Sequence, residues 1–166
     1  MAIAVRLMAV AVLAVTLLSC RSDIRALRIP NAHALVILSC FVPAYLAMPS
    51  AFAPLWSHLA AFSLMFAITY LMFYKGLMGG GDSKFASALA LWVGLRGLVP
   101  FIFYMSLMGG LLGAATLVIR KKKPFRNPPA GSWMAEAQEG KSAVPYGLAI
   151  SFGAWVAFFH TVLILH

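Results

Sequence analysis

Long apolar runs separated by short polar stretches dominate the sequence. Six runs can be drawn, at about residues 2–19, 32–48, 55–74, 82–99, 100–119 and 144–165. The first is interrupted only by Arg6, and its roughly 18 residues would rise about 27 Å as a helix, which is enough to cross the hydrocarbon core of a bilayer. The pattern predicts an all-α, polytopic membrane protein in which six transmembrane helices form a single domain over residues 1–166.

Prolines and polar stretches mark the predicted boundaries of these helices. Pro30 suits the opening of the second helix, and Pro100 is predicted to break the fourth helix from the fifth. Residues 120–143 are rich in proline, glycine and charge, so they are predicted to form a flexible, basic, cytoplasmic loop within the domain. A cleaved signal peptide is the alternative for the first run, but further apolar runs follow it rather than a secreted domain.

The composition excludes an ordinary soluble domain. Hydrophobic residues make up 63% of the chain and charged residues only 10%, whereas soluble domains are about 25% charged. The net charge of +9 does not indicate nucleic acid, because the basic residues lie between apolar runs. Basic residues in such places report membrane orientation and attract anionic lipid.

The basic residues also predict the orientation in the membrane. The stretches after the first, third and fifth runs hold eleven of the thirteen: Arg21, Arg25, Arg28, Lys75, Lys84, Arg120, Lys121, Lys122, Lys123, Arg126 and Lys141. Basic loops stay in the cytoplasm. Both chain ends are therefore expected outside, in a multi-pass protein of the bacterial inner membrane.

Two isolated aspartates are the candidate chemistry. Asp23 follows the first run and Asp82 opens the fourth, so both are expected at the cytoplasmic surface. If the first and fourth helices pack together, the carboxyl groups can meet and share one proton. The ionised group can then take a proton from water while the protonated group polarises a peptide carbonyl.

Ordinary explanations exist for each aspartate. Asp82 could be the N-cap of the fourth helix, and Asp23 could be a surface carboxylate paired with Arg21 or Arg25. The two are the only aspartates in the chain, and as a pair they favour function. Lys84 could stabilise the ionised form of Asp82 or bind an acidic residue of a substrate.

Gly79-x-Gly81-Asp82, followed by Lys84, resembles the G-x-G-D motif of the type IV prepilin peptidases, a family of membrane aspartic proteases. The stretch from Asp23 to Ile29-Pro30-Asn31 resembles a second segment of that family, in which an aspartate precedes Ile-Pro-Asn. Residues 144–150 are similar to the signature of the family's last span. The three segments follow one another in the expected order over nearly the whole chain.

The resemblance implies an enzyme that removes short basic leader peptides from prepilins at the cytoplasmic membrane face. It implies that Asp23 and Asp82 are catalytic. The residues that would support them or bind substrate are Gly79, Gly81, Lys84, Ile29, Pro30 and Asn31. The chain lacks a C-x-x-C motif and an insertion between the first two runs. It therefore resembles the small form that serves tight-adherence (Flp-type) pili, without N-methyltransferase activity.

Other readings stay open. A non-enzymatic membrane subunit, such as a transporter or a pilus assembly platform, could use the aspartates to bind protons or cations. A preflagellin peptidase or another intramembrane aspartic protease could share the same pair. The four histidines have no metal-ligand spacing, so neither a metal nor a cofactor is expected. Gly109-x-x-x-Gly113 is a helix-packing motif that leaves a homo-oligomer open.

Overall fold

The computed structural model describes residues 2–141 and 143–162, and this part of the chain is helical with no strand. Its helices are α1 (Ala2–Ala26), α2 (Asn31–Ala47), the short 3-10 helix η1 (Pro49–Ala51), α3 (Leu55–Tyr74), α4 (Gly80–Lys122), α5 (Trp133–Gln138) and α6 (Tyr146–Val162). The predicted all-α class is confirmed for these residues. The end of the sixth predicted run, residues 163–165, lies outside them.

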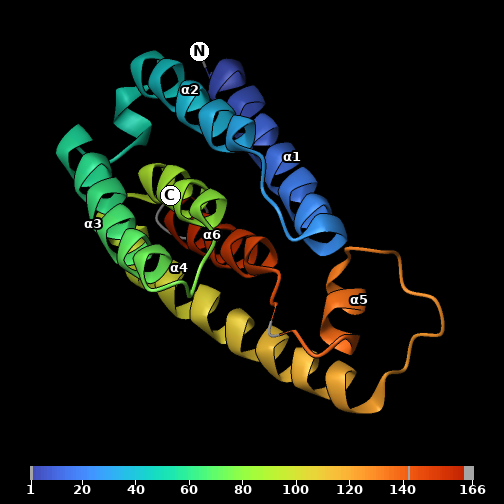
Figure 1. The fold of residues 1–166 in the computed structure, drawn as a ribbon. Coiled ribbons are helices and arrows are strands. Elements are labelled where there is room, and N and C mark those ends of the chain that lie inside the picture. The colour runs from blue at the N-terminus through green and yellow to red at the C-terminus, as the bar shows by residue number, and fades with distance from the viewer. Residues whose placement is uncertain (1, 142, 163–166) are drawn as a thin grey trace.

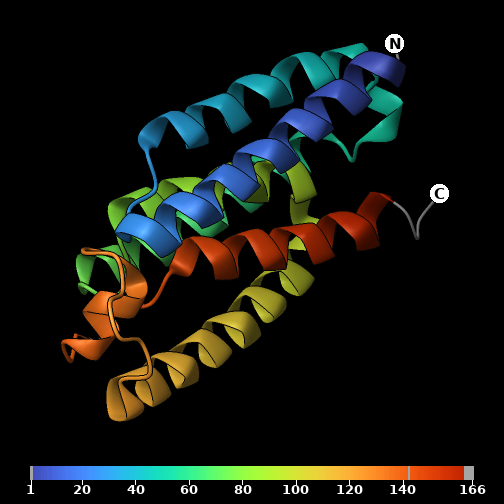
Figure 2. The ribbon, with the colours of Figure 1, turned by 90° about the vertical axis from the view of Figure 1, so that its right-hand side faces the viewer.

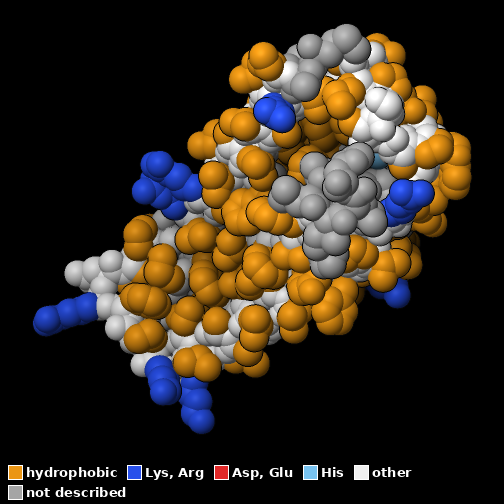
Figure 3. Space-filling model, turned by 180° about the vertical axis from the view of Figure 1, so that it is seen from behind, with side chains coloured by type: hydrophobic (Ala, Val, Ile, Leu, Met, Phe, Trp, Pro, Cys, Tyr) orange, Lys and Arg blue, Asp and Glu red, His pale blue; other side chains and the backbone are white. Residues whose placement is uncertain are grey.

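Three of the described helices are long and apolar enough to cross a membrane. They are Val5–Ala26 of α1, the whole of α3, and α4, while α2 and α6 are shorter apolar helices. Hydrophobic side chains cover most of the face in Figure 3, and several Lys and Arg side chains project at its left-hand end. A surface of this kind is suited to lipid rather than to water.

The predicted break at Pro100 is wrong, because the chain turns at Gly94 instead. Gly94 has φ 63° and ψ −175°, a backbone conformation that is essentially restricted to glycine. Figure 2 shows the two halves of α4 meeting at this turn and running back toward the same end of the molecule. A proline removes one helical hydrogen bond, and α4 remains helical through Pro100.

Ser57 and His58 satisfy the backbone groups that the break at Gly94 sets free. His58 Nδ1 is 2.6 Å from the carbonyl oxygen of Leu91, and the Leu95 N–H donates to Ser57 Oγ at 3.1 Å. Both side chains are buried. A Cβ atom at Gly94 would lie 3.2 Å from the His58 ring, so packing as well as backbone conformation requires glycine there.

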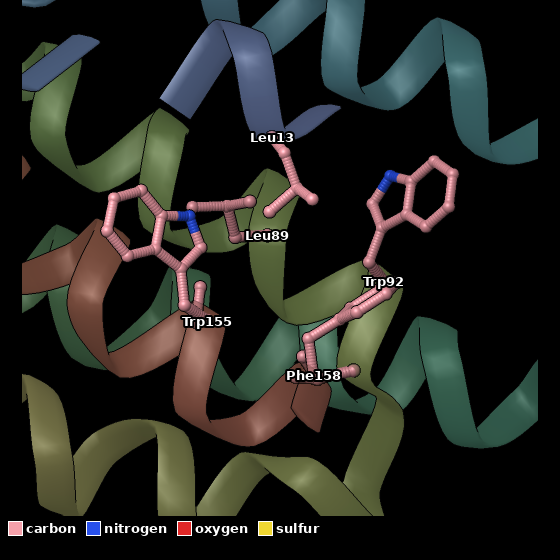
Figure 4. A pocket seen from close by; sticks show the side chains of 7 residues that line it. Leu13, Leu89, Trp92, Trp155 and Phe158 are labelled. Carbon is pink, nitrogen blue, oxygen red and sulfur yellow. The ribbon is translucent and has the colours of Figure 1, made fainter. Parts of the chain in front are cut away.

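Helix α4 is the centre of the fold. It packs against α2, α3 and α6, whereas α1 packs against α2 and α6 (Figure 1). The condition that the first and fourth helices pack together is not met by their backbones over the described residues, and α1 approaches α4 only through side chains. One apolar cavity of about 20 Å³ remains where side chains such as Leu13, Leu89 and Trp155 converge (Figure 4). It has room for about one water molecule.

Parts of the predicted loop at residues 120–143 are helical, leaving aside Ser142, which the structure does not describe. Helix α4 continues to Lys122, and α5 forms after Ser132, whose Oγ accepts the Ala135 N–H at 3.3 Å. Gln138 accepts from the Phe125 N–H at 2.8 Å and donates to its carbonyl at 3.1 Å. These local bonds and the packing of α5 on α4 and α1 hold the segment against the bundle.

Candidate active site

Asp23 lies on a helix and not in the polar loop that the sequence predicts. Helix α1 continues to Ala26 and ends where Leu27, at φ 49°, donates its N–H to the Asp23 carbonyl at 2.8 Å. A residue in the left-handed conformation is a common helix terminator. Ser22 Oγ then donates to the Arg28 carbonyl at 2.7 Å. The chain therefore folds back on α1, which places Ile29 near Asp23.

Ile29, just after α1, lies against the starts of α4 and α6. Its side chain is buried, and its carbonyl oxygen would lie only 2.7 Å from a Cβ atom added at Gly81. A Cβ atom at Gly147 would lie 2.7 Å from Ile29 Cδ1. The starts of α4 and α6 approach the Ile29 segment so closely that neither glycine can carry a side chain without displacing a neighbour.

Asp23 is bound by the start of α6. Its side chain is 3% exposed, and its Oδ2 accepts the Gly147 N–H at 2.6 Å. The first N–H groups of a helix have no intrahelical partner, so Asp23 satisfies one of them. Sequence reasoning missed Gly147 as a site residue, although it lies in the 144–150 segment that resembles the family's last span.

Asp82 is the third residue of α4, after Gly79 at the N-cap position, and is partly buried. Its Oδ2 accepts the Gly79 N–H at 3.1 Å, the reach-back contact of a residue at the third helical position. The ordinary explanation is therefore partly right: Asp82 does help to begin the helix, although not as its N-cap. The contact uses one carboxyl oxygen and leaves Oδ1 for other partners.

Both aspartates are held beside Ile29, because Gly147, which binds Asp23, packs against Ile29 Cδ1, and Gly81, next to Asp82, packs against the Ile29 carbonyl oxygen. Over the described residues, no Lys or Arg forms an ion pair with either of them. The explanation in which Asp23 pairs with Arg21 or Arg25 thus finds no support. Each carboxyl group has one backbone N–H donor, on Oδ2, and both Oδ1 atoms accept no hydrogen bond from the described chain. Within the described residues, the two acids are thus held beside the same segment without an ion-pairing cation.

The remaining predicted residues form the edge of this site. Pro30 precedes α2 in an extended conformation, which puts Asn31 first in the helix. Lys84 Nζ donates to Asn31 Oδ1 at 3.2 Å and makes no ion pair with Asp82. Lys84 therefore links α4 to α2 at the surface. The described residues contain no group of three or more His, Cys, Asp or Glu side chains that could hold a metal ion.

Comparisons with known proteins include the same residues. The model of the type IV leader peptidase family matches residues 10–114, which is more than half of the chain and includes both aspartates. The chain belongs to the type IV leader peptidase family. This confirms the resemblance seen in the sequence and, together with the apolar helices, identifies a membrane protein.

One curated relative is the prepilin leader peptidase/N-methyltransferase of Xanthomonas campestris pv. campestris, which is 32% identical over 82 residues. The matched stretch covers 49% of this chain and 23% of that relative. The chain therefore spans only about a quarter of the length of the relative. No solved structure matches the chain.

Proposed function

We propose that the protein is a membrane-embedded aspartic endopeptidase that removes short basic leader peptides from type IV prepilins of the Flp type. One observation carries the proposal. Asp23 and Asp82, from helices whose backbones do not pack on each other, are both held beside Ile29 at one end of the bundle, and no Lys or Arg of the described residues forms an ion pair with them. Two carboxyl groups in such a position share a proton, which is the arrangement that aspartic proteases use.

The hydrogen bonds indicate which atoms would act. A backbone N–H donates to Oδ2 of each aspartate. The two Oδ1 atoms are therefore the ones that would act on water and substrate. In the proposed mechanism one Oδ1 takes a proton from the attacking water, and the other, protonated, donates to the carbonyl oxygen of the scissile peptide. Gly79 keeps a side chain away from Asp82 Oδ2, and Gly81 lets the Ile29 carbonyl approach the start of α4.

The proposed setting is the bacterial inner membrane, with six spans and the site at the cytoplasmic face. The break at Gly94 supports six spans, because it divides α4 into two segments that return to the same end of the bundle (Figure 2). In that view the start of α1 and the end of α6 lie together at the end opposite α5. The concentration of basic residues at the end with the aspartates supports a cytoplasmic site and outside termini.

Peptidase activity without methyl transfer is the second part of the proposal. Helix α1 connects to α2 through residues 27–30 alone, and no C-x-x-C motif occurs, so the extra cytoplasmic region of the larger family members has no counterpart between these helices. No cofactor is needed for hydrolysis by two carboxyl groups.

The test is cleavage of candidate Flp-type prepilins by the purified protein in vesicles, with a methyl donor (S-adenosylmethionine) supplied, followed by mass spectrometry of the new N-terminus. We expect cleavage after the basic leader and a free, unmethylated amine. Absence of cleavage with every candidate, in a preparation that is folded and inserted, would reject the peptidase. A methylated product would reject the second part only.

A further inference from the structure

A groove of about 360 Å³ opens between α2 and α3, with α4 as its floor. Helices α2 and α3 each pack on α4, but over the described residues they do not pack on each other (Figure 1). The walls and floor are mainly apolar, and the lining residues are Asn31, Ala34, Leu35, Leu38, Phe62, Phe66, Lys84 and Ser87. The groove is thus open to the side of the bundle, where a membrane segment can enter.

The mouth of the groove lies near the two aspartates along the chain, through Lys84 and Asn31. Lys84 lies two residues after Asp82, and Asn31 lies two residues after Ile29, whose carbonyl touches Gly81. From the mouth the lining continues along α2 to Leu38 and along α3 to Phe62, away from the basic end of the bundle. A chain that is cut between the aspartates and then continues into the membrane would follow this course.

A ladder of aromatic rings on α3 connects the groove with the glycine run. Phe62 stacks on Phe66 with ring centroids 6.2 Å apart, Phe66 on Tyr70 at 5.7 Å, and Tyr70 lies 6.2 Å from Phe73. The Phe73 ring lies 3.3 Å from where a Cβ atom of Gly80 would be. Exposed rings in line with a site offer large apolar contact to a ligand at low conformational cost.

Charge complementarity adds a second property of the occupant. Lys84 stands at the mouth with a neutral amide, Asn31 Oδ1, as its hydrogen-bond partner and with no acid in the described chain paired to it. An anionic group arriving at the mouth would be attracted to it. The occupant is therefore apolar along most of its length and anionic near its cytoplasmic end.

We propose that this groove receives the apolar, membrane-inserted segment of the protein being cleaved, with an anionic group near the cytoplasmic end of that segment held by Lys84. The inference rests on the proposed function and deepens it. A lipid acyl chain with its phosphate at Lys84 has related chemistry. The position of Lys84 and Asn31, two residues from Asp82 and from Ile29, favours the polypeptide, and the lipid is made an outcome of the test.

The deciding experiment is photo-crosslinking in vesicles of phosphatidylethanolamine and phosphatidylglycerol. A benzophenone amino acid replaces Phe62 of α3 in the groove or, as control, Phe103 of α4, which is 60% exposed, follows the break at Gly94 and does not line the groove. Both carry Asp82→Asn so that added prepilin stays uncut. We expect position 62, and not 103, to cross-link to the apolar segment of the prepilin. Adducts with lipid alone at position 62, or equal prepilin yields at both positions, would overturn the inference.

The kinetics of two variants give an independent test. Leu35, which lines the groove, is 62% exposed, and Leu35→Trp would add bulk inside the groove. Leu46→Trp adds the same bulk on α2 outside the groove, at a residue that is 71% exposed. We expect Leu35→Trp to raise KM for prepilin about tenfold with kcat unchanged, and the control to match the wild type. An unchanged KM for Leu35→Trp would count against the groove.

Cleavage by the wild-type protein is measured first, which separates the two failures. Absence of cleavage rejects the proposed function and this inference with it. Cleavage without cross-linking from position 62 rejects the inference alone.

Discussion

The four acidic residues of the chain form two pairs, and the structure treats the pairs in opposite ways. Glu136 and Glu139 lie at α5 and share Lys141, whose Nζ is 2.7 Å from one carboxylate and 3.2 Å from the other. Asp23, which is buried, and Asp82, which is partly buried, are both held beside Ile29 and accept backbone N–H groups, and no Lys or Arg of the described residues forms an ion pair with them.

The difference indicates that the glutamate pair is a solvated surface contact and that the aspartate pair is a site. Exposed ion pairs cost little to form and contribute little to stability. Two carboxyl groups brought together out of water are unfavourable unless a cation or a proton compensates. A fold that keeps such a pair, with both Oδ1 atoms open, holds a feature that does not serve its own stability, and the proposed proton-sharing chemistry accounts for it.

The largest expected effect comes from removing one charge from each pair. Asp23→Asn and Asp82→Asn should each lower the rate of prepilin cleavage by at least about 100-fold, because an amide can neither take a proton from water nor donate one as an acid. The matched controls are Glu136→Gln and Glu139→Gln, which should cleave at the wild-type rate. Membrane insertion, checked by fractionation, should be the same for all four. An aspartate variant with near wild-type activity would end the assignment.

A second effect, about tenfold, is expected from closing the space around the aspartates. Gly81→Ala places a Cβ atom 2.7 Å from the Ile29 carbonyl, and Gly147→Ala places one 3.0 Å from Asp23 Oδ2. Moving these neighbours apart costs about 1–3 kcal/mol, and each 1.4 kcal/mol lost in the transition state is about tenfold in rate. The slowing should appear in kcat measured with saturating prepilin.

Gly113→Ala is the control for this effect, since nothing lies within 4 Å of the added Cβ atom and alanine favours a helix. Its cleavage rate and thermal midpoint in detergent should equal or exceed those of the wild type. Equal losses in all three variants would mean that glycine matters for helix packing in general and not for the aspartate pair.

Much of the fold could be predicted from the sequence because helices in a membrane protein are long apolar runs. The predicted run at residues 55–74 coincides with α3. The break at Gly94 could not be predicted, because the residue lies inside an apolar run and its conformation depends on Ser57 and His58, far away in sequence. Pro100 is the clearer break signal in the sequence, but the contacts with Ser57 and His58 fix the turn at Gly94.

The candidate site was predictable in part for a similar reason. The G-x-G-D segment is local, so Asp82 stands out, and its contact with Gly79 is made within three residues. The donor to Asp23 is Gly147, which is 124 residues away, and no local pattern reveals it. The loop at residues 120–143 also looks disordered by composition, although Gln138 and Phe125 bind each other in a way that composition does not report.

A smaller effect, about three- to fivefold, is expected for Lys84→Gln. Because Lys84 bonds to Asn31 and not to Asp82, the substitution should raise KM for prepilin and leave the shape of the pH–rate profile unchanged. Lys84→Arg, which keeps the charge, should restore most of the affinity. A shifted pH optimum in Lys84→Gln would show that the lysine acts on Asp82 and would favour the other interpretation of its role.

The smallest effect is expected from substitution of Lys141, the cation that pairs with Glu136 and Glu139. Hydrogen bonds that Lys141 donates to Glu136 and Glu139 raise the pKa of Lys141, but the group is fully exposed, and water replaces such partners readily. Lys141→Gln should therefore leave both prepilin cleavage and the thermal midpoint in detergent unchanged within error. A clear loss of activity would mean that the α5 segment takes part in substrate binding. The two acid pairs could then no longer be separated into a surface contact and a site.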